Sequence, residues 1–176
     1  MHARGVTLLI ADLPLLDAAL EGPEALSHAL GGCVVADGWE AFPEAVPAAR
    51  GILAGNPESG RWGTRLFILE DPRTLVGWGG FKGPPADGVV EVGYAVAPAF
   101  RGRGIAGDAV RQMLGDAFSV DGIEAVIAHT LAEPGPSTRV LEKSGFTNDG
   151  EVDGGEDGQV WRWRRERSTR QAEHLA

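Results

Sequence analysis

The segment Val96–Ala106 (VAPAFRGRGIA) has the residue types and spacing of a site for a negatively charged group. Arg101 and Arg103 bring positive charge, and Gly102 and Gly104 permit backbone angles that other residues avoid. The free N–H groups and the positive dipole end of a following helix would add to this attraction. The segment is therefore predicted to hold a phosphate or a pyrophosphate.

A strand before this segment and a helix after it are predicted to position it. The strand covers 89–96 and ends there because Pro98 cannot donate to a sheet ladder. The helix begins at about Arg103 and covers 103–118, where apolar residues recur every four positions and polar residues occupy the opposite face. A buried strand over 123–130 follows, so strand, helix and strand form one parallel crossover.

The remaining segments predict an α+β fold in a single domain. Strands at 65–70 and 75–81 form a hairpin and, with 89–96, three consecutive antiparallel strands. We expect a mixed, mostly antiparallel central sheet with one parallel crossover, flanked by helices. The other predicted elements are a strand at 6–11, an apolar run of uncertain type at 33–36, helices at 13–20, 23–30, 42–54 (interrupted by Pro47) and 137–144, and a final hairpin of 146–152 with 159–164.

The composition narrows the class of protein. The chain has 176 residues, enough for one sizeable core, and its net charge of −9 argues against general nucleic-acid binding. The single cysteine, Cys33, excludes an intramolecular disulfide and a cysteine-based metal cluster, and it fits a reducing cytoplasm. No apolar run approaches the roughly 20 residues of a membrane span, and the histidines lack metal-ligand spacing. We therefore expect a cytoplasmic protein without a metal, whose arginine-rich segment at 162–170 is a solvated tail.

Gly102, Gly104 and Gly107 also spell G-x-G-x-x-G, the pattern of a dinucleotide site. A nicotinamide fold would need repeated β-α-β units and an acidic residue at the far end of the next strand. That end is His129-Thr130, and the sequence before the glycines predicts an antiparallel hairpin. A dinucleotide site is therefore disfavoured, and His129 is interpreted as a hydrogen-bonded structural residue.

Three separated segments carry a family resemblance. They are VEVGYAV at 90–96, RGRGIA at 101–106 and STRVLEKSGF at 137–146. In this order and spacing they resemble the GNAT superfamily of N-acetyltransferases, in particular the branch that includes ribosomal-protein acetyltransferases. The resemblance covers roughly 65–164. It implies one domain at 1–165, with acceptor-side helices in 1–62 and an acetyl-CoA-binding core in 63–165, followed by a tail at 166–176.

The resemblance implies how acetyl-coenzyme A would bind. The backbone of Ala95 and Val96 would pair with the pantetheine arm like an added strand, which requires the strands at 89–96 and 123–130 to splay apart. A backbone N–H near Val96 could also stabilise the oxyanion of the thioester carbonyl. The pyrophosphate would be held by the loop amides of Arg101, Gly102, Arg103, Gly104, Ile105 and Ala106.

The resemblance further implies acetyl transfer to a primary amine by direct attack in a ternary complex. Glu91 is the candidate base for the amine proton, although it could instead be a solvent-facing strand residue. The tyrosine that many members use as general acid is replaced by Leu141. Ser137 occupies the position of a proton donor in the ribosomal-protein branch, but a serine at a helix start is commonly an N-cap. Tyr94 lies on the strand face opposite Glu91, which favours core packing, and nothing places a base beside Cys33 for a covalent route.

The acceptor is the least constrained part of the prediction. Trp39, Phe42 and Phe81 are candidate acceptor contacts, with core packing as the alternative for each. A protein N-terminus, an antibiotic, a polyamine and a metabolite all remain open as acceptors, as do a monomer and a homodimer. The alternative function is a non-catalytic acyl-CoA-binding sensor with the same fold.

Overall fold

The structure is a computed structural model, and it describes residues 5–168. The strands are β1 (Val6–Ile10), β2 (Val34–Val35), β3 (Thr64–Glu70), β4 (Arg73–Phe81), β5 (Val89–Val96), β6 (Ala125–Leu131), β7 (Thr147–Asp153) and β8 (Gln159–Glu166). The helices are α1 (Leu13–Glu21), α2 (Pro23–Ala29), α3 (Ala45–Gly55), α4 (Ile105–Phe118) and α5 (Pro136–Lys143). Short 3-10 helices are η1 (Pro57–Trp62), η2 (Pro98–Phe100) and η3 (Gly155–Asp157).

The strands form one mixed sheet in the order β1-β3-β4-β5-β6-β8-β7. Neighbours pair antiparallel except β5 and β6, which are parallel and joined through α4. This confirms the predicted fold class and the three consecutive antiparallel strands. The short strand β2 adds a second parallel contact, two residues long, with β4. A doubly wound parallel sheet, as a nicotinamide fold requires, is therefore excluded.

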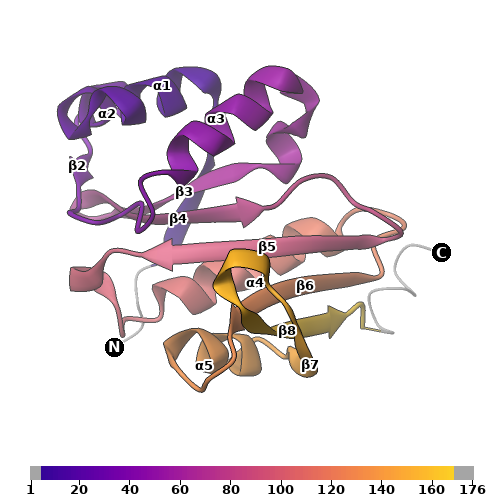
Figure 1. The fold of residues 1–176 in the computed structure, drawn as a ribbon. Coiled ribbons are helices and arrows are strands. Elements are labelled where there is room, and N and C mark those ends of the chain that lie inside the picture. Colours follow the sequence, from indigo (N-terminus) through magenta and orange to yellow (C-terminus); the bar gives the residue numbers. More distant parts are fainter. Residues whose placement is uncertain (1–4, 169–176) are drawn as a thin grey trace.

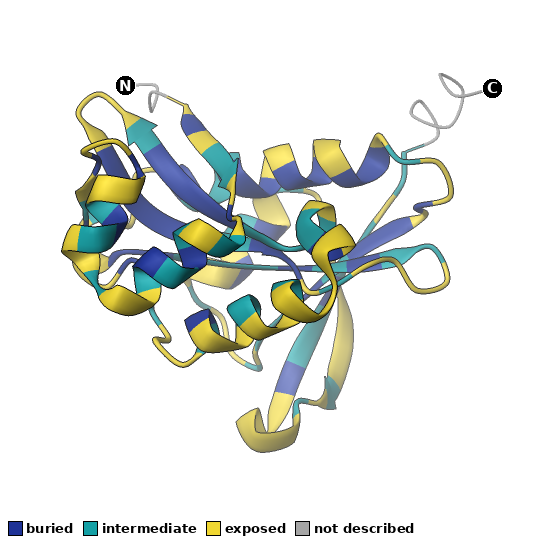
Figure 2. Ribbon diagram, turned by 90° about the horizontal axis from the view of Figure 1, so that it is seen from above, coloured by how far each residue is buried: buried dark blue, intermediate teal, exposed yellow. Residues whose placement is uncertain are grey.

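The helices cover both faces of the sheet. In Figure 1, α1, α2 and α3 gather over β3 and β4 on one face, while α4 lies on the other. Alternation along β3 sends Leu66 and Ile68 into the core under α1–α3 and Phe67 into the core against α4. Figure 2 shows the resulting pattern, in which helices are buried on the side facing the sheet and exposed on the other.

Strand β5 matches its predicted bounds, but the helix after it begins two residues later than predicted. Gly102 (φ 73°) and Gly104 (φ 80°) both adopt left-handed backbone angles. Gly104 is the N-cap of α4, so the chain becomes helical only at Ile105. The glycine turn therefore delays the helix and faces its first N–H groups outward.

The parallel pairing of β5 with β6 is short. The register runs from Val89↔Ala125 to Glu91↔Ile127 and then ends, although β5 continues to Val96. Strand β6 meanwhile stays paired with β8 up to Leu131. The two central strands thus splay apart as predicted.

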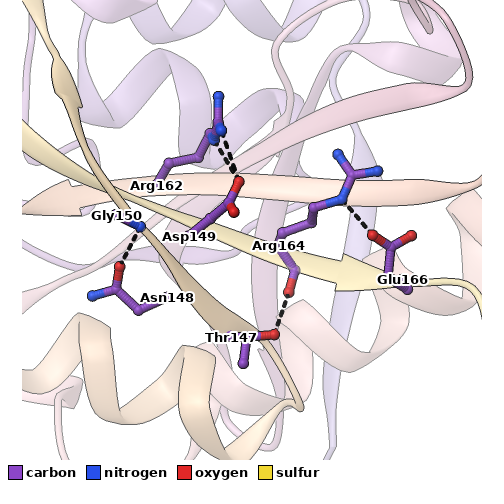
Figure 3. A network of polar contacts seen from close by, with 7 residues as sticks. All are labelled: Thr147, Asn148, Asp149, Gly150, Arg162, Arg164 and Glu166. Atoms are coloured by element: carbon purple, nitrogen blue, oxygen red, sulfur yellow. Dashed lines mark hydrogen bonds and ion pairs between the residues drawn. The ribbon is translucent and has the colours of Figure 1, made fainter.

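The arginines near the C-terminus form part of the fold, which corrects their interpretation as a tail. Arg162, Arg164 and Arg165 lie in β8, so the expected division after residue 165 falls inside a strand. Figure 3 shows Arg162 paired with Asp149 of β7 and Arg164 with Glu166. The Arg167 side chain donates hydrogen bonds to the carbonyls of Phe118, Val120 and Ile123. Arg170 lies outside the described residues.

Candidate active site

The free edge of β5 presents main-chain groups to the gap between β5 and β6. Lys82 N–H donates to the Glu91 carbonyl, and Ala97 N–H donates to the Val76 carbonyl. Because hydrogen-bonding residues alternate along an antiparallel ladder, Ala95 turns its main chain toward β4. Tyr94 and Val96 turn theirs toward the gap, beyond the end of the β6 register. Of the two residues expected to meet a pantetheine arm, Val96 has this orientation and Ala95 does not.

The start of α4 follows this edge after η2 and the glycine turn. The first intrahelical bond runs from Asp108 N–H to the Gly104 carbonyl, and no side chain caps the helix. The N–H groups of Ile105, Ala106 and Gly107 are therefore left without intrahelical acceptors. A Cβ on Gly102 or Gly104 would meet nothing within 4 Å, so the turn opens onto free space. This is the geometry of an anion site at a helix N-terminus.

Both loop arginines fold back on the loop while remaining exposed. Arg101 Nε donates to the Val96 carbonyl at 3.0 Å, and Arg103 Nη2 donates to the Ala99 carbonyl at 3.1 Å. The Arg103 guanidinium also lies 4.9 Å from the centroid of the Phe100 ring. The arginines thus brace the loop, and they keep two positive charges beside the helix start.

A cavity of about 890 Å³ opens where β5 and β6 separate. The unpaired ends of both strands line it on one side, and α3 with the segment before it lines the other. Its lining comprises Ala11, Leu16, Phe42, Ala45, Ala48, Ala49, Ile52, Leu53, Ser59, Gly60, Gly63, Thr64, Trp78, Gly79, Gly80, Phe81, Lys82, Val92, Gly93, Tyr94, Ala95, His129, Thr130, Leu131, Asp157 and Val160.

Glu91 forms the polar centre of the site with two partners. Its Oε1 lies 2.8 Å from Lys82 Nζ and 2.8 Å from His129 Nδ1. Burial acts to raise the pKa of Glu91, but the hydrogen bonds with Lys82 and His129 outweigh it and hold that pKa below its usual value. Lys82 and His129 line the cavity, whereas Glu91 lies behind them. The carboxylate is therefore ionised and already engaged.

Tyr94 and Ser137 meet at the other face of β5. The Tyr94 hydroxyl donates to the Ser137 carbonyl at 3.2 Å, and burial raises the pKa of Tyr94. Ser137 is exposed and does not line the cavity. Nor is it the N-cap of α5, because Gly135 holds that position and Thr138 Oγ1 bonds its N–H and carbonyl.

The three predicted acceptor aromatics occupy different environments. Phe42 is 64% exposed and lines the cavity. Phe81 also lines it, packed edge-to-face on Trp62 at 5.0 Å. Trp39 is buried and lies 5.6 Å from Trp78, which does line the cavity. Trp39 therefore supports the wall from behind.

Metal-ligating side chains and the single thiol are the remaining candidates for chemistry among residues 5–168. No group of three or more histidine, cysteine, aspartate or glutamate side chains there could hold a metal ion. Cys33 is fully buried away from the cavity, and burial raises the pKa of its thiol, which disfavours a covalent route. In the same part of the chain, no helix combines the length and apolarity of a membrane span.

Sequence reasoning missed Lys82 and undervalued His129. Lys82 follows directly on the antiparallel pair Phe81↔Val92, so one further step of that register brings it opposite Glu91. The sequence predicts the antiparallel strands but not their register. His129 lies two residues past Ile127, the last partner of Glu91, on the same face of a parallel strand. Its hydrogen bond with Glu91 requires the parallel register, which the sequence did not specify.

Comparison with known proteins places the chain in a family. A family model described as an acetyltransferase (GNAT) domain matches residues 10–147. The chain is 30% identical over 149 residues to the uncharacterized N-acetyltransferase YjdG of Bacillus subtilis (strain 168), covering 83% of this chain and 88% of that protein.

Two solved structures share the fold at lower identity. RimL, a ribosomal L7/L12 alpha-N-protein acetyltransferase in complex with coenzyme A, has a TM-score of 0.66 and 17% identity over 92% of this chain and 94% of that one. A spermidine N-acetyltransferase SpeG chimera from Vibrio cholerae and hSSAT has a TM-score of 0.67 and 15% identity over 97% and 98%. Together with the family match, these findings show that the chain belongs to the GNAT family of N-acetyltransferases.

Proposed function

We propose that this protein transfers an acetyl group from acetyl-coenzyme A to a primary amine by direct attack in a ternary complex. One observation carries the proposal. The pairing of β5 with β6 stops at Glu91, the far end of β5 continues toward an uncapped helix N-terminus, and the gap between the strands opens onto a large cavity. A thioester carrier matches these features: its diphosphate suits the helix N-terminus, its extended arm suits the gap, and its thioester would face the cavity.

The chain's own residues suit both parts of the carrier. The N–H groups from Ile105 to Gly107 and the charges of Arg101 and Arg103 would hold the diphosphate. Tyr94 N–H and carbonyl and Val96 N–H would pair with the amide-containing arm as a short added strand. The Val96 carbonyl is already bonded to Arg101, so Val96 offers its N–H alone. The bound carrier supplies an activated acetyl group.

The amine proton requires an acceptor, and we assign it to His129. With Glu91 ionised, His129 Nδ1 must carry the hydrogen of their 2.8 Å contact. In the uncharged form of the ring, Nε2 carries a lone pair, and this atom has no hydrogen-bond partner among residues 5–168. Because His129 lines the cavity, an uncharged amine there could pass a proton to Nε2 as its nitrogen forms the new C–N bond. The C–S bond then breaks, its electron pair leaves with sulfur as the thiolate of coenzyme A, and the thiolate takes a proton from solvent. Glu91 becomes the positioning residue for this ring.

The first experiment distinguishes an acetyltransferase from a non-catalytic acyl-CoA-binding sensor. Acetyl-coenzyme A is titrated in by calorimetry, and thiol release is then followed with a thiol reagent across a panel of amines; the buried Cys33 should contribute little background. We expect binding with amine-dependent release. Binding without release for every amine would favour the non-catalytic sensor, and absence of binding would refute both functions.

A further inference from the structure

We propose that the acceptor is a primary amine attached to an apolar, uncharged body. This inference rests on the proposed function and names the substrate class of the same cavity. It follows from two independent properties of the acceptor side, the shape of the α3 face and the charges around it.

Large apolar side chains are left exposed around the cavity. Phe42 and Ile52 are each 64% exposed and Leu131 is 61% exposed, although they come from three separate segments. All three line the cavity. Exposed apolar groups that converge on one hollow mark a site that takes up apolar material.

Helix α3 presents one apolar face that packs partly against the core, through Ala45, Ala49 and Leu53, and also borders the cavity. Ala45, Ala48, Ala49, Ile52 and Leu53 follow the i, i+3, i+4, i+7, i+8 spacing of one helix face, and all of them line the cavity. Only Val46 of α3 is buried. The alanines leave room between the larger side chains, so the face can receive a ring or an alkyl chain.

The charges around the cavity are too few for a polycation. Among the lining residues, Asp157 is the only carboxylate, and Lys82 is the only lysine or arginine. Lys82 is already paired with Glu91 at 2.8 Å. The net charge of −9 therefore resides elsewhere on the molecule. A polyamine or an aminoglycoside would bury several ammonium groups here without partners, which is costly.

The polar groups mark where the amine would lie. Tyr94, His129 and Thr130 belong to the splayed ends of β5 and β6, across the cavity from α3. An acceptor with its apolar body against α3 would thus direct its nitrogen toward His129. Such an acceptor can be a small free amine or a peptide whose first residue is apolar.

The test compares amines of matched size under identical acetyl-coenzyme A concentrations. We expect kcat/KM for 2-phenylethylamine and hexylamine to exceed that for ethanolamine and spermidine at least tenfold. Tripeptide amides beginning with phenylalanine or lysine distinguish the source: faster turnover of the phenylalanine peptide than of the free amines indicates a protein N-terminus, and the reverse indicates a small molecule. Preference for spermidine, ethanolamine or the lysine peptide would overturn the inference and leave the proposed function intact.

A matched pair of variants tests the wall itself. Ile52→Gln should lower kcat/KM for 2-phenylethylamine about tenfold and change that for ethanolamine less than twofold. Ile10→Gln makes the same substitution at a residue that is 48% exposed and does not line the cavity, so it should change neither. Equal loss for both amines in Ile52→Gln would contradict an apolar contact. Acetyl-coenzyme A binding without turnover of any amine would instead refute the proposed function.

Discussion

The two sides of the cleft are built from different chemical groups. On the α4 side, the groups that face the opening are main-chain N–H and carbonyl groups of β5 and of the helix start. On the α3 side, they are apolar side chains. Main-chain groups persist through most substitutions and depend on backbone angles, whereas a side-chain wall changes with every substitution. The α4 side therefore suits a ligand that stays the same as the sequence changes. The α3 side suits a ligand that is matched to its own set of side chains.

The largest expected effect lies between the two sides, at His129. We predict that His129→Gln lowers kcat by about 10²- to 10⁴-fold and leaves coenzyme affinity within twofold, because the role we propose for the ring is to accept the amine proton and not to bind the coenzyme. Glu91→Gln should lower kcat less, because it changes only the group that positions the ring. If Glu91→Gln were the more damaging variant, Glu91 would be the base.

The main-chain side is tested most sharply at Gly104. We predict that Gly104→Val weakens coenzyme binding by at least about tenfold, because a β-branched residue resists the φ of 80° and would distort the helix start. Gly115→Ala, in the same helix at an ordinary φ, is the control and should bind normally. Calorimetry measures both. Unchanged binding in Gly104→Val would show that the turn does not form the anion site.

The third prediction concerns the anchoring of α4 to β6. Arg167 donates to three carbonyls between the end of α4 and the start of β6. Arg167→Met should therefore lower the free energy of unfolding by about 2 kcal/mol, as expected when buried acceptors lose a charged donor. Arg164→Met removes an exposed pair with Glu166 and should change it by less than about 1 kcal/mol. Urea unfolding would contradict this if the two losses were equal.

The smallest expected effect is a shift in titration. Lys82→Met removes one of two partners that hold the pKa of Glu91 low, so that pKa should rise. A depressed carboxyl pKa stabilises the fold above the unfolded value of about 4.3, and this stabilisation is lost as the pH falls through the folded pKa. In Lys82→Met, this stabilisation should therefore be smaller, and its loss on acidification should be complete at a higher pH. NMR titration of Glu91 measures the shift, with the exposed Lys143→Met as control; an unchanged pKa would mean that the ion pair is absent in solution.

The same contrast explains which parts were predictable from the sequence. Strand β5 and the glycine turn follow from local signals, namely Pro98, Gly102 and Gly104, because proline and glycine restrict the backbone wherever they occur. The α4 periodicity also suffices to place its buried face. These local rules place most of the α4 side of the cleft, although the helix starts two residues later than predicted.

The acceptor side could not be predicted in this way. The sequence indicates that α3 is amphipathic, but an apolar helix face looks the same whether it meets a core or a cavity. Likewise, Glu91 and His129 are 38 positions apart and meet only through the parallel register of β5 and β6. Trp39 and Phe42 are near neighbours in the sequence, yet one is buried and the other lines the opening. Such distinctions depend on packing between distant segments.

The interrupted pairing of β5 and β6 leaves a gap in the middle of the sheet, here called the window. The turn before α4 borders this window from one face, and α3 borders it from the other. Two reactants could therefore bind from opposite faces of the sheet and meet only in the gap between the strands. Neither would have to dissociate before the other bound. Substitutions on one face could also change one binding site without altering the other.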